Sequence, residues 1–229
     1  MGIYRCVRDT IPSTSTTDKC IVLDLDETLI HTSERISQLE KLEILTDPSL
    51  FHLRERVYIL EIDDVVDKPG MGNTSVLWGI KRPGLHEFLL FCFQHFRIVA
   101  VWSAGKARYV EAICQEIFKD LCDPHIIFTW DHCETGDDYL EKPLQKMIEE
   151  FNDPRMTIKN TVAIDDRKST FSDVNPENGI LIPAYDPVMN VKKISKNEKS
   201  LSQLQEWFKN PEFVNTHDVR ELNKSNIFV

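Results

Sequence analysis

The 229-residue sequence lacks several features that define large classes of proteins. It has no run of about 18 apolar residues, which excludes a typical membrane-spanning helix, and we expect no membrane partner. Its first residues lack the hydrophobic segment of a signal peptide. Its six cysteines include no C-x-x-C pair, so we expect reduced thiols in an intracellular protein and no disulfide framework.

Positive charge is also scarce, since 27 Lys and Arg residues face 37 Asp and Glu residues, for a net charge of −10. A field of this sign repels a phosphate backbone, so we expect no direct binding to nucleic acid. We interpret the basic cluster at 192–199 as a solvated surface segment. The pair Gly70-x-Gly72 is too short for a dinucleotide-binding fingerprint, and we interpret it as a turn.

Short apolar segments alternate with helical patterns along most of the chain. Strands are expected at residues 21–23, 97–102, 125–129, 161–164 and 179–182. Helices are expected from Pro83 to about residue 95, around Tyr109 to Ile117, at 144–151 and around Leu201 to Phe208. This alternation predicts an α/β fold, a Rossmann-like and mostly parallel sheet with helices on both faces.

The expected organisation is a polar lead-in over residues 1–18 and a single domain over residues 19–229. Residues 31–80 are predicted to form an inserted flap of one helix and a β-hairpin. Alternating segments at 56–63 and 74–81 supply the hairpin strands. Ser33 is predicted to cap the helix, which carries apolar residues at helical spacing: Ile36, Leu39, Leu42 and Leu45.

The first apolar strand ends in two aspartates, Asp24 and Asp26, followed by Thr28. Open α/β sheets bind their ligands in the crevice at the carboxyl ends of the strands. Two carboxylates and a hydroxyl placed there suit a divalent cation and a phosphoryl group. The alternative is that these residues end the strand and cap the segment that follows.

Three further polar segments fall where other elements end or begin. Ser103 follows a strand and is expected to open a helix, which makes either an anion seat or a plain N-cap. Lys142 precedes Pro143 at a helix start, where the helix dipole disfavours a cation, so it either serves a ligand or is simply exposed. Asp165 and Asp166 end an apolar strand, where they either hold a cation or form a solvated turn.

The order of these segments resembles the haloacid dehalogenase superfamily of phosphotransferases. Within it, the sequence is similar to the FCP/SCP phosphatases, which act on the carboxy-terminal domain of RNA polymerase II. Many other superfamily members have Gly at the position of Glu27. The motifs that carry the resemblance are Asp24-Leu-Asp26-Glu27-Thr28-Leu-Ile-His31, Lys81-Arg82-Pro83-Gly84, Trp102-Ser103-Ala104-Gly105 with Tyr109, Lys142, Asp165-Asp166 and Asn175-Pro176-Glu177-Asn178-Gly179-Ile180.

The resemblance implies a haloacid dehalogenase fold and a role for each site residue. Asp24 is the implied nucleophile, which forms an aspartyl-phosphate, and Asp26 is the implied general acid and then base. Mg²⁺ is the implied cofactor, with ligands from the side chain of Asp24, the main-chain carbonyl of Asp26, Asp165 and Asp166. The implied phosphate-binding residues are Thr28, Ser103, Ala104 through its amide, and Lys142, and Thr28 also braces the loop.

Charge counting supports these roles independently. The four ionised aspartates outweigh Lys142 and a divalent cation by one negative charge, before a dianionic phosphate binds. Like charges at short range raise the pKa of at least one carboxyl, and Asp26 is the best candidate to hold that proton.

The implied function is a Mg²⁺-dependent serine/threonine phosphatase of phosphorylated proteins or peptides, with the carboxy-terminal domain of RNA polymerase II as the model substrate. A nuclear or cytoplasmic location and a link to transcription follow from the same resemblance. One alternative is a phosphatase of a metabolite or of a nucleic-acid 3′-phosphate, and another is a non-catalytic scaffold. A zinc site formed by Cys122-x-x-His125 and His132-Cys133 is a further alternative.

Overall fold

The computed structural model describes residues 15–63, 72, 74–135, 140–170, 174–187, 190–195 and 198–228. Its central element is a five-stranded sheet in which every neighbouring pair of strands is parallel. In spatial order the strands are β10 (Gly179–Leu181), β9 (Thr161–Asp165), β1 (Cys20–Leu23), β5 (Ile98–Trp102) and β6 (Ile126–Phe128). Because β1 is flanked by β5 and β9, three strands from distant parts of the sequence end side by side.

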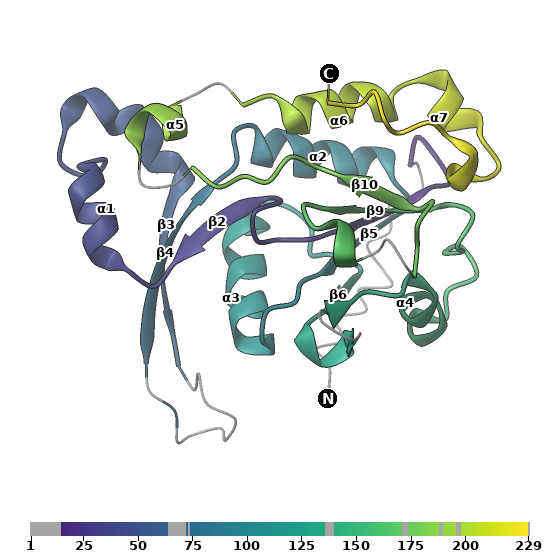
Figure 1. The fold of residues 1–229 in the computed structure, drawn as a ribbon, viewed down its shortest axis with the longest axis horizontal. Coiled ribbons are helices and arrows are strands. Elements are labelled where there is room, and N and C mark those ends of the chain that lie inside the picture. Colours follow the sequence, from purple (N-terminus) through teal and green to yellow (C-terminus); the bar gives the residue numbers. More distant parts are fainter. Residues whose placement is uncertain are drawn as a thin grey trace.

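Helices cover both faces of this sheet (Figure 1). Ile21 and Leu23 of β1 point to the face covered by α2 (Leu85–His95), α3 (Ala107–Ile117) and α6 (Ser200–Phe208). Cys20 and Val22 point to the opposite face, covered by α4 (Leu144–Phe151). Successive side chains of a strand alternate between faces, and burial on both faces explains why the whole strand is apolar. The predicted α/β fold is confirmed.

A second, smaller sheet stands beside the first and comes from the inserted segment (Figure 1). Its antiparallel strands have the order β2, β4, β3, and a 3-10 helix at Pro48–Arg56 leads into β3. Their bounds are β2 (Ile30–Ser33), β3 (Val57–Ile62) and β4 (Ser75–Lys81), with α1 (Ile36–Leu42) between β2 and β3. The turn expected at Gly70-x-Gly72 lies outside the described residues, apart from Gly72 itself.

Helix α1 begins and ends differently from the sequence prediction. Its N-cap is Arg35, whereas Ser33 is the last residue of β2 and its Oγ accepts a hydrogen bond from the Arg35 amide at 3.2 Å. The prediction that Ser33 caps the helix was therefore wrong. The helix ends at Leu42 because Glu43 has a left-handed backbone (φ 54°), and Leu45 beyond it is exposed.

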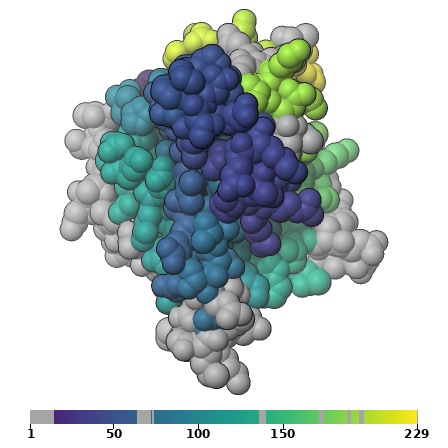
Figure 2. Space-filling view, turned by 90° about the vertical axis from the view of Figure 1, so that its left-hand side faces the viewer, coloured from purple at the N-terminus to yellow at the C-terminus, as the bar shows by residue number. Residues whose placement is uncertain are grey.

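The C-terminal segment packs against the insertion and the core. In Figure 2 the dark-blue atoms of the insertion occupy the middle of one face, and green atoms of the C-terminal half lie next to them. Ile194 of α5 (Val191–Ser195) is buried among residues of the insertion. Further on, α7 (Pro211–Asn215) and a 3-10 helix at Val219–Glu221 bury Phe213 and Val219 in the main core.

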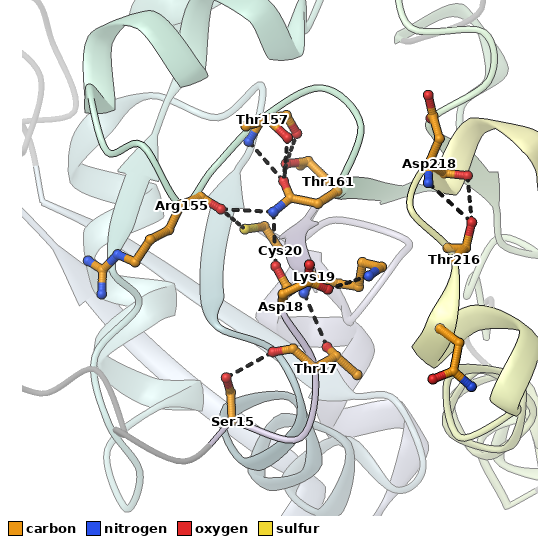
Figure 3. A network of polar contacts seen from close by, with 12 residues as sticks. Ser15, Thr17, Asp18, Lys19, Cys20, Arg155, Thr157, Thr161, Thr216 and Asp218 are labelled. Carbon is orange, nitrogen blue, oxygen red and sulfur yellow. Dashed lines mark hydrogen bonds and ion pairs between the residues drawn. The ribbon is translucent and has the colours of Figure 1, made fainter.

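Polar contacts fix the opposite edge of the sheet, at the amino ends of β1 and β9 (Figure 3). The Asn160 side-chain amide donates to the carbonyls of Asp18 and Arg155, at 2.9 and 2.8 Å. The Thr17 amide donates to the carbonyl of His95 at the end of α2, at 2.9 Å. These bonds anchor the chain just before β1 and hold its register relative to β9.

The remaining short elements connect the larger ones. They are 3-10 helices at Trp130–His132 and Lys168–Thr170 and a two-stranded ribbon of β7 (Glu134–Thr135) and β8 (Leu140–Glu141). Across the described residues, the model contains no helix with the length and apolar character needed to cross a bilayer.

Candidate active site

The strand register brings two pairs of aspartates to the same edge of the sheet. The early acid pair is Asp24 and Asp26, and the late acid pair is Asp165 and Asp166. Leu23 is level with Ile164 of β9 and with Val101 of β5, so Asp24 is level with Asp165. The Asp24 amide donates to the Ile164 carbonyl at 3.0 Å, which extends the ladder by one bond. From β1 the chain adds β5 and β6 on one side, and then β9 and β10 on the other side. The direction of strand addition therefore changes between β1 and β9, and open α/β sheets bind ligands at such a position.

Lys142 joins the two acid pairs. Its Nζ lies 2.7 Å from Asp24 Oδ1 and 2.7 Å from Asp165 Oδ2, and all three side chains are buried. Burial alone lowers the pKa of Lys142, but the Asp24 and Asp165 carboxylates outweigh it and raise the pKa, so the ammonium stays charged. A small pocket lined in part by these three residues and Trp102 lies at this edge.

Asn175 holds the backbone of Lys142 in place. Its side-chain amide donates to the Lys142 carbonyl at 2.7 Å, and its Oδ1 accepts from the amide of Leu144 at 2.9 Å. The two bonds span the start of α4, where Pro143 supplies no amide hydrogen. Asn175 is itself buried, so both bonds are shielded from water.

The carboxylates of this cluster fit a divalent cation. One carboxylate oxygen from each of Asp24, Asp165 and Asp166 can be chosen so that all lie within 4.8 Å of one another. Around an octahedral Mg²⁺ with bonds of about 2.1 Å, adjacent ligands are about 3 Å apart and opposite ones about 4.2 Å. These three ionised groups carry two negative charges more than Lys142 neutralises, which matches a dication. All-oxygen ligands suit hard cations such as Mg²⁺, Ca²⁺ or Mn²⁺ better than softer metals.

Burial raises the pKa of Asp24 to about 7, with further increases from Asp165 and Asp26, while Lys142 opposes the shift. The pKa of Asp166 is also raised, by burial and then by the Asp165 charge. A bound dication stabilises the ionised carboxylates and reverses these shifts. The raised pKa values thus reflect the burial of both carboxyls together with the excess of negative charge around them.

The loop after β1 is braced by buried polar contacts. Thr28 is fully buried, and its hydroxyl accepts a hydrogen bond from the Asp166 amide at 3.1 Å. Arg82, also buried, donates to the Thr28 carbonyl at 2.8 Å and pairs with Glu198. Thr28 therefore links the early loop to the late acid pair, while direct phosphate binding by Thr28 stays a prediction.

Glu27 has a left-handed backbone, with φ of 56°. Such a conformation costs a residue with a side chain roughly 1–2 kcal/mol, and it is one that glycine adopts freely. A glycine at this position would avoid that cost. Here the Glu27 side chain contacts His31 Nδ1 at 3.1 Å.

Asp26 is held by a tyrosine from another part of the fold. The hydroxyl of Tyr109 on α3 donates to Asp26 Oδ1. Burial raises the pKa of Asp26, and the bond from Tyr109 partly offsets that increase. Tyr109 reaches Asp26 by lying against Gly105, where a Cβ atom would sit 2.6 Å from the Tyr109 ring. A side chain at position 105 would displace this ring.

Ser103 and Ala104 lie in the turn between β5 and α3. Ser103 does not open the helix as predicted, because α3 begins at Ala107 and its N-cap is Lys106. Instead the Ser103 hydroxyl accepts a hydrogen bond from the Gly105 amide at 2.9 Å. A hydroxyl that accepts this bond keeps its own hydrogen for a ligand oxygen.

Lys142 thus contacts Asp24 and Asp165 directly, and a carboxylate oxygen of Asp166 lies within 4.8 Å of one from each of these two aspartates. Asp26 lies two residues after Asp24. Asn175, Arg82 and Tyr109 all lie in the motifs that carry the family resemblance, but no role was predicted for them. Their place in those motifs was the signal in the sequence that could have indicated a role in the site. Their contacts depend on tertiary structure.

Within the described residues, the candidate zinc ligands of the alternative site do not come together as a group of potential metal ligands. His125 Nδ1 and His132 Nδ1 each accept a backbone hydrogen bond at 3.0 Å, from Val99 and Thr129 respectively. Within the described part of the chain, the group of three or more potential metal ligands is the aspartate cluster.

Comparison with known proteins agrees with this fold. The chain belongs to the family of NLI interacting factor-like phosphatases, whose model matches residues 19–220. This match confirms the predicted FCP-type branch of the haloacid dehalogenase superfamily and the enzyme class, phosphatase.

Two curated relatives illustrate the range of similarity. Ubiquitin-like domain-containing CTD phosphatase 1 of Gallus gallus is 28% identical over 207 residues, which cover 86% of this chain and 61% of the relative. Phosphatase PSR1 of Saccharomyces cerevisiae is 32% identical over 112 residues, covering 48% of this chain and 20% of the relative. The chain therefore matches about three fifths of the CTD phosphatase's length.

Solved structures support the fold. Fission yeast RNA polymerase II CTD phosphatase Fcp1 bound to beryllium fluoride matches with a TM-score of 0.57 and 18% identity, over 82% of this chain and 49% of that one. Another structure of Fcp1, an essential RNA polymerase II CTD phosphatase, gives a TM-score of 0.57 and 17% identity, over 90% and 58%.

Proposed function

We propose that this protein is a Mg²⁺-dependent serine/threonine phosphatase that acts through an aspartyl-phosphate on Asp24. The observation that carries the proposal is the contact of Lys142 with both Asp24 and Asp165, beside Asp166. One buried cation among three carboxylates leaves two negative charges, which a dication would neutralise.

In the proposed first step, an Asp24 carboxylate oxygen attacks phosphorus and the bond from phosphorus to the substrate oxygen breaks. Asp26 gives its proton to that leaving oxygen. In the second step, Asp26 takes a proton from a water, whose oxygen attacks phosphorus. The bond to Asp24 then breaks, which releases inorganic phosphate and restores both carboxyl groups.

The other residues bind and orient the phosphoryl group. Lys142 and the free hydrogen of Ser103, with the amide of Ala104, bind its non-bridging oxygens. Asp24, Asp165, Asp166 and the Asp26 carbonyl would hold Mg²⁺, which would supply positive charge beside the attacking carboxylate and the phosphoryl oxygens.

The proposed substrate is a phosphoserine in a protein segment that resembles the RNA polymerase II carboxy-terminal domain. The relatives that bear the name CTD phosphatase support this choice, as does the net charge of −10, which disfavours a nucleic-acid substrate. A role in transcription follows from the same substrate.

A substrate panel tests this proposal. We expect phosphoserine heptad peptides to be hydrolysed with a higher kcat/KM than sugar phosphates or 3′-phosphorylated oligonucleotides. A tenfold preference for either of the latter would replace the proposed substrate class. Asp24→Asn should abolish turnover and trapping by beryllofluoride, whereas turnover close to the wild-type rate would exclude Asp24 as the nucleophile.

A further inference from the structure

Three hydroxyl groups from three separate elements form a chain that ends at Asp26. Tyr58 OH on β3 lies 2.7 Å from Thr32 Oγ1 on β2. Thr32 Oγ1 lies 2.9 Å from Tyr109 OH on α3, and Tyr109 donates to Asp26 Oδ1. The chain thus runs from the inserted sheet to the proposed general acid.

A glycine makes the first contact of this chain possible. Gly79 of the central strand β4 is paired with Thr32 on one side and with Tyr58 on the other. A Cβ atom at position 79 would lie 2.2 Å from Tyr58 OH. The Tyr58 side chain therefore crosses over Gly79 to reach Thr32, and any side chain at position 79 would block that path.

The chemistry of the groups sets the direction of the hydrogen bonds. Each hydroxyl has one hydrogen, and Oδ1 of Asp26, which accepts from Tyr109, cannot donate while any carboxyl proton is on Oδ2. Tyr109 therefore donates to Asp26 and accepts from Thr32, which in turn accepts from Tyr58. Tyr58 is 4% exposed, so water competes little for its hydrogen.

We propose that Tyr58 and Thr32 are positioning residues that keep the Tyr109 hydroxyl aimed at Asp26. With Oδ1 of Asp26 fixed by Tyr109, the other carboxyl oxygen faces the substrate and carries the transferred proton. The inserted sheet thereby becomes part of the acid–base machinery. This inference rests on the proposed phosphatase function.

Substrates with different leaving groups separate this role from a structural one. A seryl oxygen leaves poorly without a proton, whereas p-nitrophenolate needs little protonation. Tyr58→Phe removes one hydroxyl and should lower kcat/KM for a phosphoserine peptide about tenfold, which is a fraction of the roughly 10²–10⁴-fold that a general acid contributes, because Asp26 itself remains. For p-nitrophenyl phosphate the loss should stay below twofold. An equal loss for both substrates, or a loss below twofold for the peptide, would overturn the inference.

Thr32 provides a second pair of variants. Thr32→Val keeps the shape but breaks the chain, and should reproduce the selective loss of Tyr58→Phe. Thr32→Ser keeps the hydroxyl and should restore the wild-type ratio between the two substrates. Tyr185→Phe is the matched control, because it removes a buried tyrosine hydroxyl that contacts Arg56 at 2.5 Å. It should leave the ratio unchanged, and a selective loss in this control would refute the assignment.

A spectroscopic measurement on the metal-free protein makes the inference independent of activity. With carbon-13 at tyrosine Cζ, the Tyr109 signal should move in Tyr58→Phe and in Thr32→Val but not in Tyr185→Phe. A Tyr109 signal that does not move in these two variants would refute the proposed series of hydrogen bonds from Tyr58 through Thr32 to Tyr109. If the wild type hydrolyses neither substrate while the signal moves, the proposed function fails and the hydroxyl chain stands.

Discussion

The ammonium nitrogen of Lys142 lies 2.7 Å from Asp24 Oδ1, although the two residues are 118 positions apart in the sequence. Lys142 also contacts Asp165, so one cation joins carboxylates at the ends of two neighbouring strands. Removing the ammonium and the two carboxylates from water costs free energy. The buried arrangement is stable because each of these charged groups contacts one of opposite charge. The electrostatics of the site therefore depend on this lysine.

Replacing Lys142 with methionine should destabilise the metal-free protein by about 3 kcal/mol, because two buried carboxylates lose their partner. Mg²⁺ should stabilise Lys142→Met more than the wild type, since it then binds a more negative site. Urea unfolding with and without Mg²⁺ measures both effects. Lys146→Met is the control, because Lys146 is more exposed and lies 3.8 Å from its partner Glu134. Equal effects in the two variants would contradict the assignment.

The stability of the metal-free protein should fall as pH rises from about 4 to 7. Asp24 has a pKa raised to about 7, chiefly by burial, compared with about 4 in an unfolded chain. The native state therefore holds a proton that the unfolded state has released, and raising the pH removes this contribution. Asp24→Asn should flatten the decline, whereas the exposed Asp120→Asn should not. Urea midpoints at several pH values test this, and an unchanged slope in Asp24→Asn would disprove it.

Much of the fold was predictable because it depends on local patterns. The helix expected at 144–151 has those bounds in the structure, since Pro143 precedes it and its apolar residues share one face. The first strand was predicted from its apolar run. The rule that ligands bind at the carboxyl ends of strands then indicated the acids after it as candidates for the site.

Contacts between distant elements were not predictable in the same way. The helix cap expected at Ser103 failed because a tight turn, closed by the Gly105 amide, precedes α3. The path from Tyr58 to Tyr109 requires the register of three strands and an empty position at Gly79. A single sequence shows the glycine but not its neighbours.

Asn175→Ala should lower kcat/KM at least tenfold, because the lost bonds hold Lys142 and the start of α4. Misplacement of a charged group by a fraction of an ångström weakens its contact with the transition state. Asn178→Ala is the matched control, since Asn178 is also buried and its amide donates to the carbonyls of Ile158 and Thr161. It should reduce the free energy of unfolding but leave kcat/KM within twofold. A similar kinetic loss in both variants would mean that Asn175 acts only through stability.

Asp166→Asn should raise the Mg²⁺ concentration needed for half-maximal hydrolysis at least tenfold. The amide keeps the shape but removes one negative charge from the aspartate cluster, and carboxylate charge is the main source of affinity for Mg²⁺. The Asp166 backbone amide still bonds to Thr28 in the variant, so the loop should keep its position. Magnesium titrations of the wild type, Asp166→Asn and Asp120→Asn measure the shift. At saturating Mg²⁺ the rate of Asp166→Asn should recover toward that of the wild type, and an unchanged magnesium requirement would remove Asp166 from the metal site.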